Sequence, residues 1–236
     1  MWPENTMLAF DNAHAYGAGG FETDLRLSRD GDIILSHDDN LARFRLPELT
    51  LSQLTTAETK RIKIKSISGA FEDTIITLRD LLQKYPDKSY IFDCKTSDET
   101  LFVTLAHVLK DIDFHDRIWF LTWSAQADAF VKTYFPGYAY FPRESITRKW
   151  GLFSIIGLGK FFTPPHQILS LPAYYHHLPV MKKQQVLSLQ QAGRHFVGYI
   201  VNTEKEYNRC RECGVQTVLT DRADLIQRLN QSHKET

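Results

Sequence analysis

The stretch Gly20-Phe-Glu-Thr-Asp-Leu-Arg-Leu-Ser28, continued by Arg-Asp-Gly-Asp32 and Ile-Ile-Leu-Ser-His37, decides the fold expected of this chain. The pattern of residues 21–27 is typical of a strand. On such a strand the side chains of Glu22 and Asp24 project from one face, and those of Phe21, Thr23 and Leu25 project from the other. The Asp-Gly turn predicts that residues 33–35 return as a second strand. His37 would end that strand, close to the acid pair.

Two carboxylates side by side repel each other unless a cation or a hydrogen-bond donor lies between them. A hard divalent ion with oxygen ligands is the usual partner, so Glu22 and Asp24 are candidate metal ligands. Alternating acids also occur on solvated strand faces, and the pair alone leaves that alternative open.

Composition limits the classes of protein to consider. The 236 residues are 43% hydrophobic, enough for a substantial core, and their 28 basic residues balance 28 acidic ones. This balance gives no reason to expect a nucleic acid partner. Three cysteines are a poor disulfide framework, and with no leader-like segment visible we expect a cytoplasmic protein.

Short apolar runs alternate with helical patterns along the rest of the chain, which is typical of parallel strands joined by crossover helices. We therefore predict an α/β fold, a single (β/α)8 TIM barrel domain over residues 1–236, with a doubly wound sheet as the alternative. A loop is expected at 66–74. The other expected elements are strands at 89–94, 118–123, 138–141, 167–171, 196–201 and 217–219, and helices at 51–65, 78–84, 98–109, 125–134, 179–192, 204–213 and 224–231.

A barrel carries its chemistry at the carboxyl ends of its strands. The strand at 89–94 ends with Asp93 and then Lys95, two apart and on one face. Asp93 would be a third carboxylate for the ion, and Lys95 a positive charge for a phosphate oxygen, although an ordinary Asp-Lys pair is the alternative. Trp123 and Tyr199, at later strand ends, are candidate walls of a substrate pocket or core residues.

The ordered set Pro3-Glu-Asn-Thr6, a short helix, Gly-x-x-x-Glu-x-Asp-x-x-x-Ser-x-Asp-Gly and Ser-His-Asp-x-x-Leu-x-Arg43 resembles the glycerophosphodiester phosphodiesterase family. The resemblance implies a TIM barrel that uses magnesium or calcium to hydrolyse a small-molecule glycerophosphodiester to an alcohol and glycerol 3-phosphate. It implies that Glu22, Asp24 and Asp93 bind the ion, that Lys95 contacts phosphate, and that His37 is one of two acid/base histidines.

Two departures from the family pattern bear on the expected activity. Asp93 stands where the phosphodiesterases usually have Glu, and Asp-x-Lys is similar to the related sphingomyelinase D barrels. The family's first strand ends in His-Arg-Gly, which has no counterpart before Pro3. We expect that Met1 is internal to a longer protein and that activity requires the preceding strand. A silent phosphodiester-binding barrel is the alternative.

Residues 150–162 form the longest apolar run, Trp-Gly-Leu-Phe-Ser-Ile-Ile-Gly-Leu-Gly-Lys-Phe-Phe. This run is too short to span a bilayer. Its place after the strand at 138–141 puts it on the active-site side of a barrel, where it would touch a membrane or hold the acyl chain of a lysophospholipid. A helix or loop packed on the barrel is the plainer alternative.

Overall fold

The computed structural model describes residues 2–110 and 115–232. Backbone contacts divide the chain into two compact units, Met1–Tyr138 and Ala139–Thr236. A single barrel domain over the whole chain remains a prediction. Among the described residues, no helix is long and apolar enough to cross a membrane.

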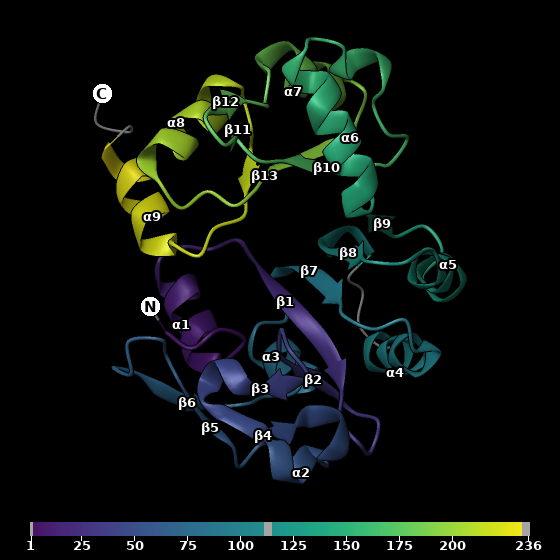
Figure 1. The fold of residues 1–236 in the computed structure, drawn as a ribbon, viewed down its shortest axis with the longest axis vertical. Helices are drawn as coiled ribbons and strands as arrows, with labels where there is room; N and C mark the ends of the chain where they lie inside the picture. The colour runs from purple at the N-terminus through teal and green to yellow at the C-terminus, as the bar shows by residue number, and fades with distance from the viewer. Residues whose placement is uncertain (1, 111–114, 233–236) are drawn as a thin grey trace. The chain divides into compact units, whose positions relative to one another are not determined.

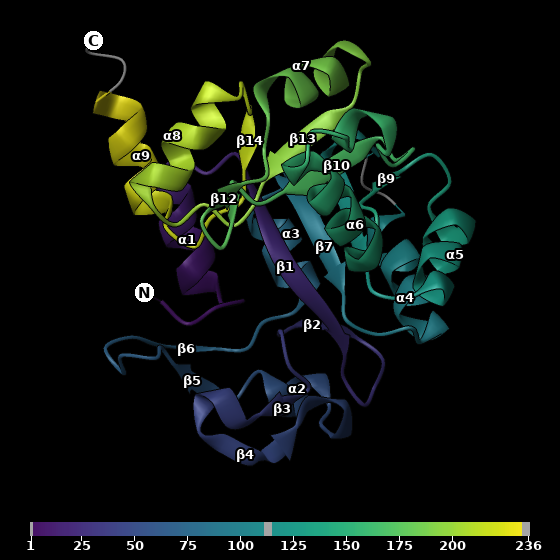
Figure 2. The same cartoon turned by 45° about the horizontal axis from the view of Figure 1, so that its top comes forward.

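The first unit contains a mainly parallel sheet with strand order β2-β1-β7-β8, in which only β2 runs antiparallel to its neighbour. Figure 2 shows β1 and β7 side by side. The elements of this unit are α1 (Met7–Ala15), β1 (Gly20–Leu27), β2 (Ile33–Leu35), β3 (Asn40–Leu41), η1 (Ala42–Phe44), β4 (Leu46–Thr50), η2 (Leu51–Gln53), α2 (Thr56–Thr59), β5 (Lys63–Lys65), β6 (Glu72–Thr74), α3 (Leu78–Lys84), β7 (Ser89–Cys94), α4 (Glu99–Leu109), η3 (His115–Arg117), β8 (Ile118–Thr122) and α5 (Ala125–Tyr134).

The predicted opening hairpin is confirmed, with Leu25 opposite Leu35 in the β1–β2 register. Strand alternation explains its stability, because the face of β1 opposite the two acids is buried. Phe21 on that face packs against the ring of Phe10, with ring centroids 5.1 Å apart, and Thr23 is fully buried. The hairpin therefore holds both carboxylates on a strand that the core fixes in place.

The predicted helix at 51–65 and the predicted loop at 66–74 are wrong. Thr55 adopts an extended backbone and forms a capping box with Glu58, so a new one-turn helix, α2, begins there. The following Lys63-Ile64-Lys65 alternates polar and apolar side chains and pairs as β5 with β6, burying Ile64. Local capping and period-two alternation thus override the helical pattern.

The second unit has a parallel sheet of order β10-β13-β14 and a core around Trp150. Its helix α7 begins four residues later than predicted, because Pro179 belongs to a short hairpin strand. The elements are β9 (Ala139–Tyr140), α6 (Glu144–Ile155), η4 (Gly159–Phe161), β10 (Ile168–Leu171), β11 (Tyr174–Tyr175), β12 (Leu178–Pro179), α7 (Lys183–Gln191), β13 (His195–Gly198), α8 (Glu204–Glu212), β14 (Thr217–Val218) and α9 (Ala223–Ser232).

Candidate active site

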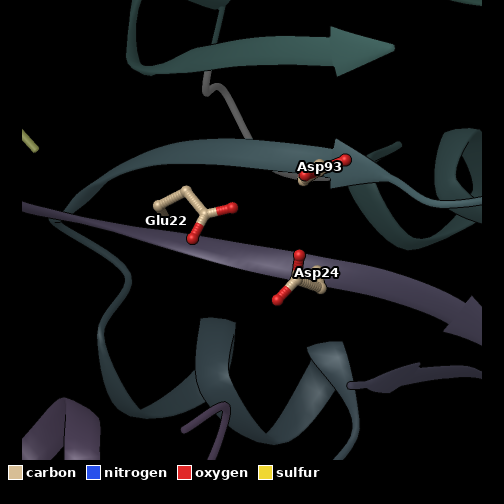
Figure 3. A group of neighbouring side chains, drawn as sticks. All are labelled: Glu22, Asp24 and Asp93. Atoms are coloured by element: carbon tan, nitrogen blue, oxygen red, sulfur yellow. The ribbon is translucent and has the colours of Figure 1, made fainter. Parts of the chain in front are cut away.

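Two neighbouring parallel strands of the first unit bring three carboxylates together. Glu22 and Asp24 project from the same side of β1, and Asp93 from β7 (Figure 3). The register places Asp24 beside Asp93, and one oxygen of each of the three carboxylates lies within 4.8 Å of the others. Asp24 and Asp93 are buried, and Glu22 is partly so. The structure thus brings together the three acids that the sequence singles out.

The ammonium group of Lys95 neutralises part of this charge. Its Nζ lies 2.9 Å from Asp24 Oδ1 and 2.6 Å from Asp93 Oδ2. Burial raises the pKa of Asp93, although hydrogen bonds from Lys95 and Trp123 act in the opposite direction. Burial alone would lower the pKa of Lys95, but the hydrogen bonds and charges of the two aspartates outweigh it and raise that pKa. A cation therefore already satisfies part of the acid cluster.

Asn5 also orients the cluster, a role that sequence reasoning did not assign. Its Nδ2 donates to Asp24 Oδ2 at 2.7 Å, and its Oδ1 accepts from Thr23 Oγ1 at 2.7 Å and from the Asp24 amide at 3.2 Å. The backbone of Asn5 is left-handed, with φ 55°, a conformation that asparagine tolerates better than most residues. The Pro-Glu-Asn-Thr motif contained this residue, but its partner is 19 positions away.

Trp123 lies directly after β8 and belongs to the same site. Its indole Nε1 donates to Asp93 Oδ1 at 2.6 Å, and the ammonium of Lys95 lies 5.1 Å from its ring centroid. The residue is nevertheless 52% exposed. One edge of the ring therefore holds a carboxylate while the rest remains accessible, so Trp123 is not a core residue.

His37 lies two residues after β2 in a polar network of its own. Its Nδ1 is 2.8 Å from Asp38 Oδ1, and its carbonyl oxygen accepts from Arg26 Nη2 at 2.6 Å. Asp38 also pairs with Arg43 Nε at 2.8 Å, and Arg43 forms a further ion pair with Glu4. A proton on Nδ1 would be donated to the Asp38 carboxylate, and this contact orients the imidazole ring.

Tyr199 belongs to the second unit, directly after β13. Burial raises the pKa of its hydroxyl, and the negative charge of Glu144 adds to the effect. The cluster that the first unit forms does not include it, and its role as a pocket wall remains a prediction.

The donor set of the first unit fits a hard divalent cation. Three carboxylates supply only oxygen, the ligand type that Mg²⁺ and Ca²⁺ prefer, and Lys95 shows that positive charge is accepted at this place. An ion there would lower the pKa of the neighbouring carboxyl groups. The chain is thus an α/β protein with an acidic, cation-compatible centre on neighbouring parallel strands.

Comparison with known proteins identifies the family. Residues 1–225 match the model of the glycerophosphoryl diester phosphodiesterase family, and the chain belongs to this family. It is 24% identical over 228 residues to a glycerophosphodiester phosphodiesterase of Caldanaerobacter subterraneus, covering 93% of this chain and 88% of that protein. It is also 24% identical over 250 residues to a lysophospholipase D of Mus musculus, covering 92% of this chain and 75% of that one.

Solved structures of the family share the fold. The glycerophosphoryl diester phosphodiesterase domain of an uncharacterized Mycobacterium tuberculosis protein superposes with a TM-score of 0.81 at 19% identity, covering 97% of this chain and 94% of that one. An Oleispira antarctica phosphodiesterase, solved in complex with the product sn-glycerol-3-phosphate, gives 0.71 at 22% identity, covering 100% and 92%. The predicted α/β barrel fold and the predicted membership in a family of phosphoric diester hydrolases are confirmed.

Proposed function

We propose that this protein hydrolyses glycerophosphodiesters to an alcohol and glycerol 3-phosphate. The observation that carries the proposal is the convergence of Glu22, Asp24 and Asp93 within 4.8 Å, beside Lys95, in a chain of the phosphodiesterase family. The relative from Oleispira antarctica, with its bound sn-glycerol-3-phosphate, supports the same product.

In this proposal the three carboxylates hold a magnesium or calcium ion, which offsets the negative charge that develops on the phosphoryl group. Lys95 contacts a phosphate oxygen and adds a second positive charge, which its raised pKa keeps in place at neutral pH. Asn5 holds Asp24 in the orientation that ligation requires, and Trp123 does the same for Asp93.

His37 is the proposed general acid. A histidine donates a proton to a leaving alkoxide near neutral pH, and the carboxylate of Asp38 keeps the ring oriented for this transfer. Trp123, exposed beside the acids, is proposed as a wall for the glycerol or alcohol part of the substrate.

The test is the release of glycerol 3-phosphate from glycerophosphocholine by the full chain, with magnesium, with calcium and with a chelator. The proposal expects release that depends on the ion and stops in the chelator. Release at the same rate in the chelator would overturn the metal-dependent mechanism. Binding of the ion without any release of glycerol 3-phosphate would favour a protein that binds phosphodiesters without hydrolysing them. The presence of His37 and Lys95 argues against this alternative.

A lysophospholipid is the second candidate substrate. The curated relatives include lysophospholipases D, and several apolar side chains within residues 150–162 are exposed in the structure. Release of choline from lysophosphatidylcholine, measured beside release from glycerophosphocholine, separates the two substrates. A cytoplasmic location remains a prediction that rests on the odd number of cysteines in the sequence.

A further inference from the structure

The helix α6 and the turn η4 of the second unit present large apolar side chains to solvent. Five residues form what we call the α6–η4 surface: Leu152, Ile156, Leu158, Phe161 and Phe162. Phe161 is 68% exposed, Leu152 62% and Ile156 61%. A run of large exposed apolar residues on one segment is uncommon in soluble proteins and indicates a binding surface.

The opposite side of the same segment is well packed, so the exposure is not a sign of a poorly ordered core. Trp150 is 1% exposed, and its Nε1 donates to the carbonyl oxygen of Gly159 at 3.0 Å. The rings of Phe153 and Phe162 stack with centroids 3.9 Å apart, which ties the turn to the helix. Any side chain at Gly159 would meet Ser154 Oγ at 2.4 Å, so only glycine allows this close approach. A fixed platform therefore carries the exposed residues.

The charged residues of the segment 145–203 all have one sign. The whole chain is neutral, yet no Asp or Glu occurs between Glu144 and Glu204, where there are six basic residues, Arg148, Lys149, Lys160, Lys182, Lys183 and Arg194. Lys149 precedes Leu152 by three positions, so helical spacing puts both on one face of α6, and Ile156 caps the end of the helix. Lys160 Nζ lies 4.9 Å from the ring centroid of Phe161.

Two more of these basic residues lie beside the platform. Arg194 Nη1 donates to the carbonyl oxygen of Pro164 at 2.9 Å, just after the turn. Lys183 begins α7, and Gln185 of that helix donates to Ser154 of α6 at 2.9 Å (Figure 1 shows both helices). Arg148 pairs with Glu144 at the start of α6, whereas residues 145–203 contain no acidic residue to offset the other five basic ones. The platform thus combines apolar side chains with a mainly basic surround.

We infer that the α6–η4 surface binds the face of an anionic phospholipid bilayer. Phe, Leu and Ile side chains enter the boundary between headgroups and acyl chains, while the flanking lysines and arginines face the negative headgroups. Charge complementarity selects this partner over an apolar protein groove. The inference goes beyond the proposed hydrolysis and does not rest on it, since binding to a bilayer is measured without turnover.

Flotation of the full chain with lipid vesicles tests the inference. We expect the chain to float with vesicles of phosphatidylcholine and phosphatidylglycerol in equal parts, and far less with vesicles of phosphatidylcholine alone or at high salt. The double variant Ile156→Ser/Phe161→Ser should bind the anionic vesicles at least about tenfold more weakly. Ile67→Ser, which changes a fully exposed isoleucine of the first unit, is the matched control and should bind normally.

The charge component has its own variants. Lys149→Glu and Lys160→Glu should each weaken binding to the anionic vesicles by about fivefold. Lys110→Glu, at an exposed position after α4, is the control. Failure of the native chain to float with anionic vesicles, or flotation unchanged by the double variant, would overturn the inference. The native chain could instead form a dimer in solution that Phe161→Ser dissociates, and fail to bind vesicles. That result would show that a second copy of the chain, and not a bilayer, covers this surface.

Discussion

Folded proteins usually bury apolar side chains and expose charged ones. The acidic centre of the first unit and the α6–η4 surface of the second depart from this rule in opposite ways. The first buries Asp24 and Asp93 beside the partly buried Lys95, whereas the second exposes residues such as Phe161. Charged residues are almost never fully buried unless paired, and large exposed apolar patches indicate binding. Each departure therefore fits a different kind of partner, and those we propose are a divalent cation with a phosphate group for the first unit and a bilayer for the second.

The two regions also differ in how the structure tolerates the departure. Burying an ionised group without partners costs several kcal/mol per ion, so the acidic centre needs Lys95, Asn5 and Trp123 as donors. The exposed surface needs no partner to remain folded, because the buried side of α6 supplies the packing. Substitutions in the first region should thus affect chemistry, and substitutions of the exposed residues should affect binding alone.

The largest effect is expected for Asp24→Ala. Removal of this ligand should lower ion-dependent release of glycerol 3-phosphate by at least about 10³-fold, because the ion supplies several kcal/mol of charge stabilisation in the transition state. Lys95 retains Asp93 as its partner, so the fold should persist by circular dichroism. Asp87→Ala, which removes an exposed carboxylate outside the cluster, is the control, and persistent activity of Asp24→Ala would remove Asp24 from the ligand set.

His37→Ala should come next, lowering the rate by about 10²- to 10⁴-fold if His37 is the general acid. Ion binding by calorimetry should remain unchanged, because the imidazole is outside the carboxylate set. His177→Ala, in the second unit, serves as the matched histidine control. A much smaller loss in His37→Ala would assign His37 to substrate positioning only.

Trp150→Ala and Phe161→Ser sharpen the contrast within the second unit. Trp150→Ala should lower the free energy of unfolding by about 3 to 5 kcal/mol, because it opens a cavity and removes one of the hydrogen bonds to the Gly159 carbonyl oxygen. Phe161→Ser should change that free energy by less than about 0.5 kcal/mol. Denaturant titration measures both, and equal losses would mean that Phe161 serves the fold rather than a partner.

Asn5→Ala is expected to have the smallest effect on the acidic centre. Loss of the hydrogen bond to Asp24 should weaken affinity for the ion by about 10- to 100-fold, the usual range for residues that orient a ligand. The rate at saturating ion should change little, since the three carboxylates remain. Calorimetry and a titration of rate against ion concentration measure the two quantities, and an unchanged affinity would show that Asn5 serves the backbone turn alone.

Much of the site follows from local sequence patterns. Period-two alternation places Glu22 and Asp24 on one face, and the turn and parallel pairing then bring Asp93 alongside. The hydrogen bonds that Asn5 and Trp123 donate to Asp24 and Asp93 could not be predicted, because these partners lie 19 and 30 positions away and depend on tertiary packing. The same limit applies to the apolar run at 150–162, where composition alone does not show which side chains the core buries.

The most direct test of the account is calorimetric titration of magnesium and calcium into the full chain and into Asp24→Asn and Asp93→Asn. We predict one bound ion per native chain and strongly weakened binding in both variants, with ion-dependent release of glycerol 3-phosphate lost in parallel. Binding that is the same in all three proteins, or hydrolysis of glycerophosphocholine by the native chain without any ion, would contradict the claim that this acidic centre is the catalytic metal site.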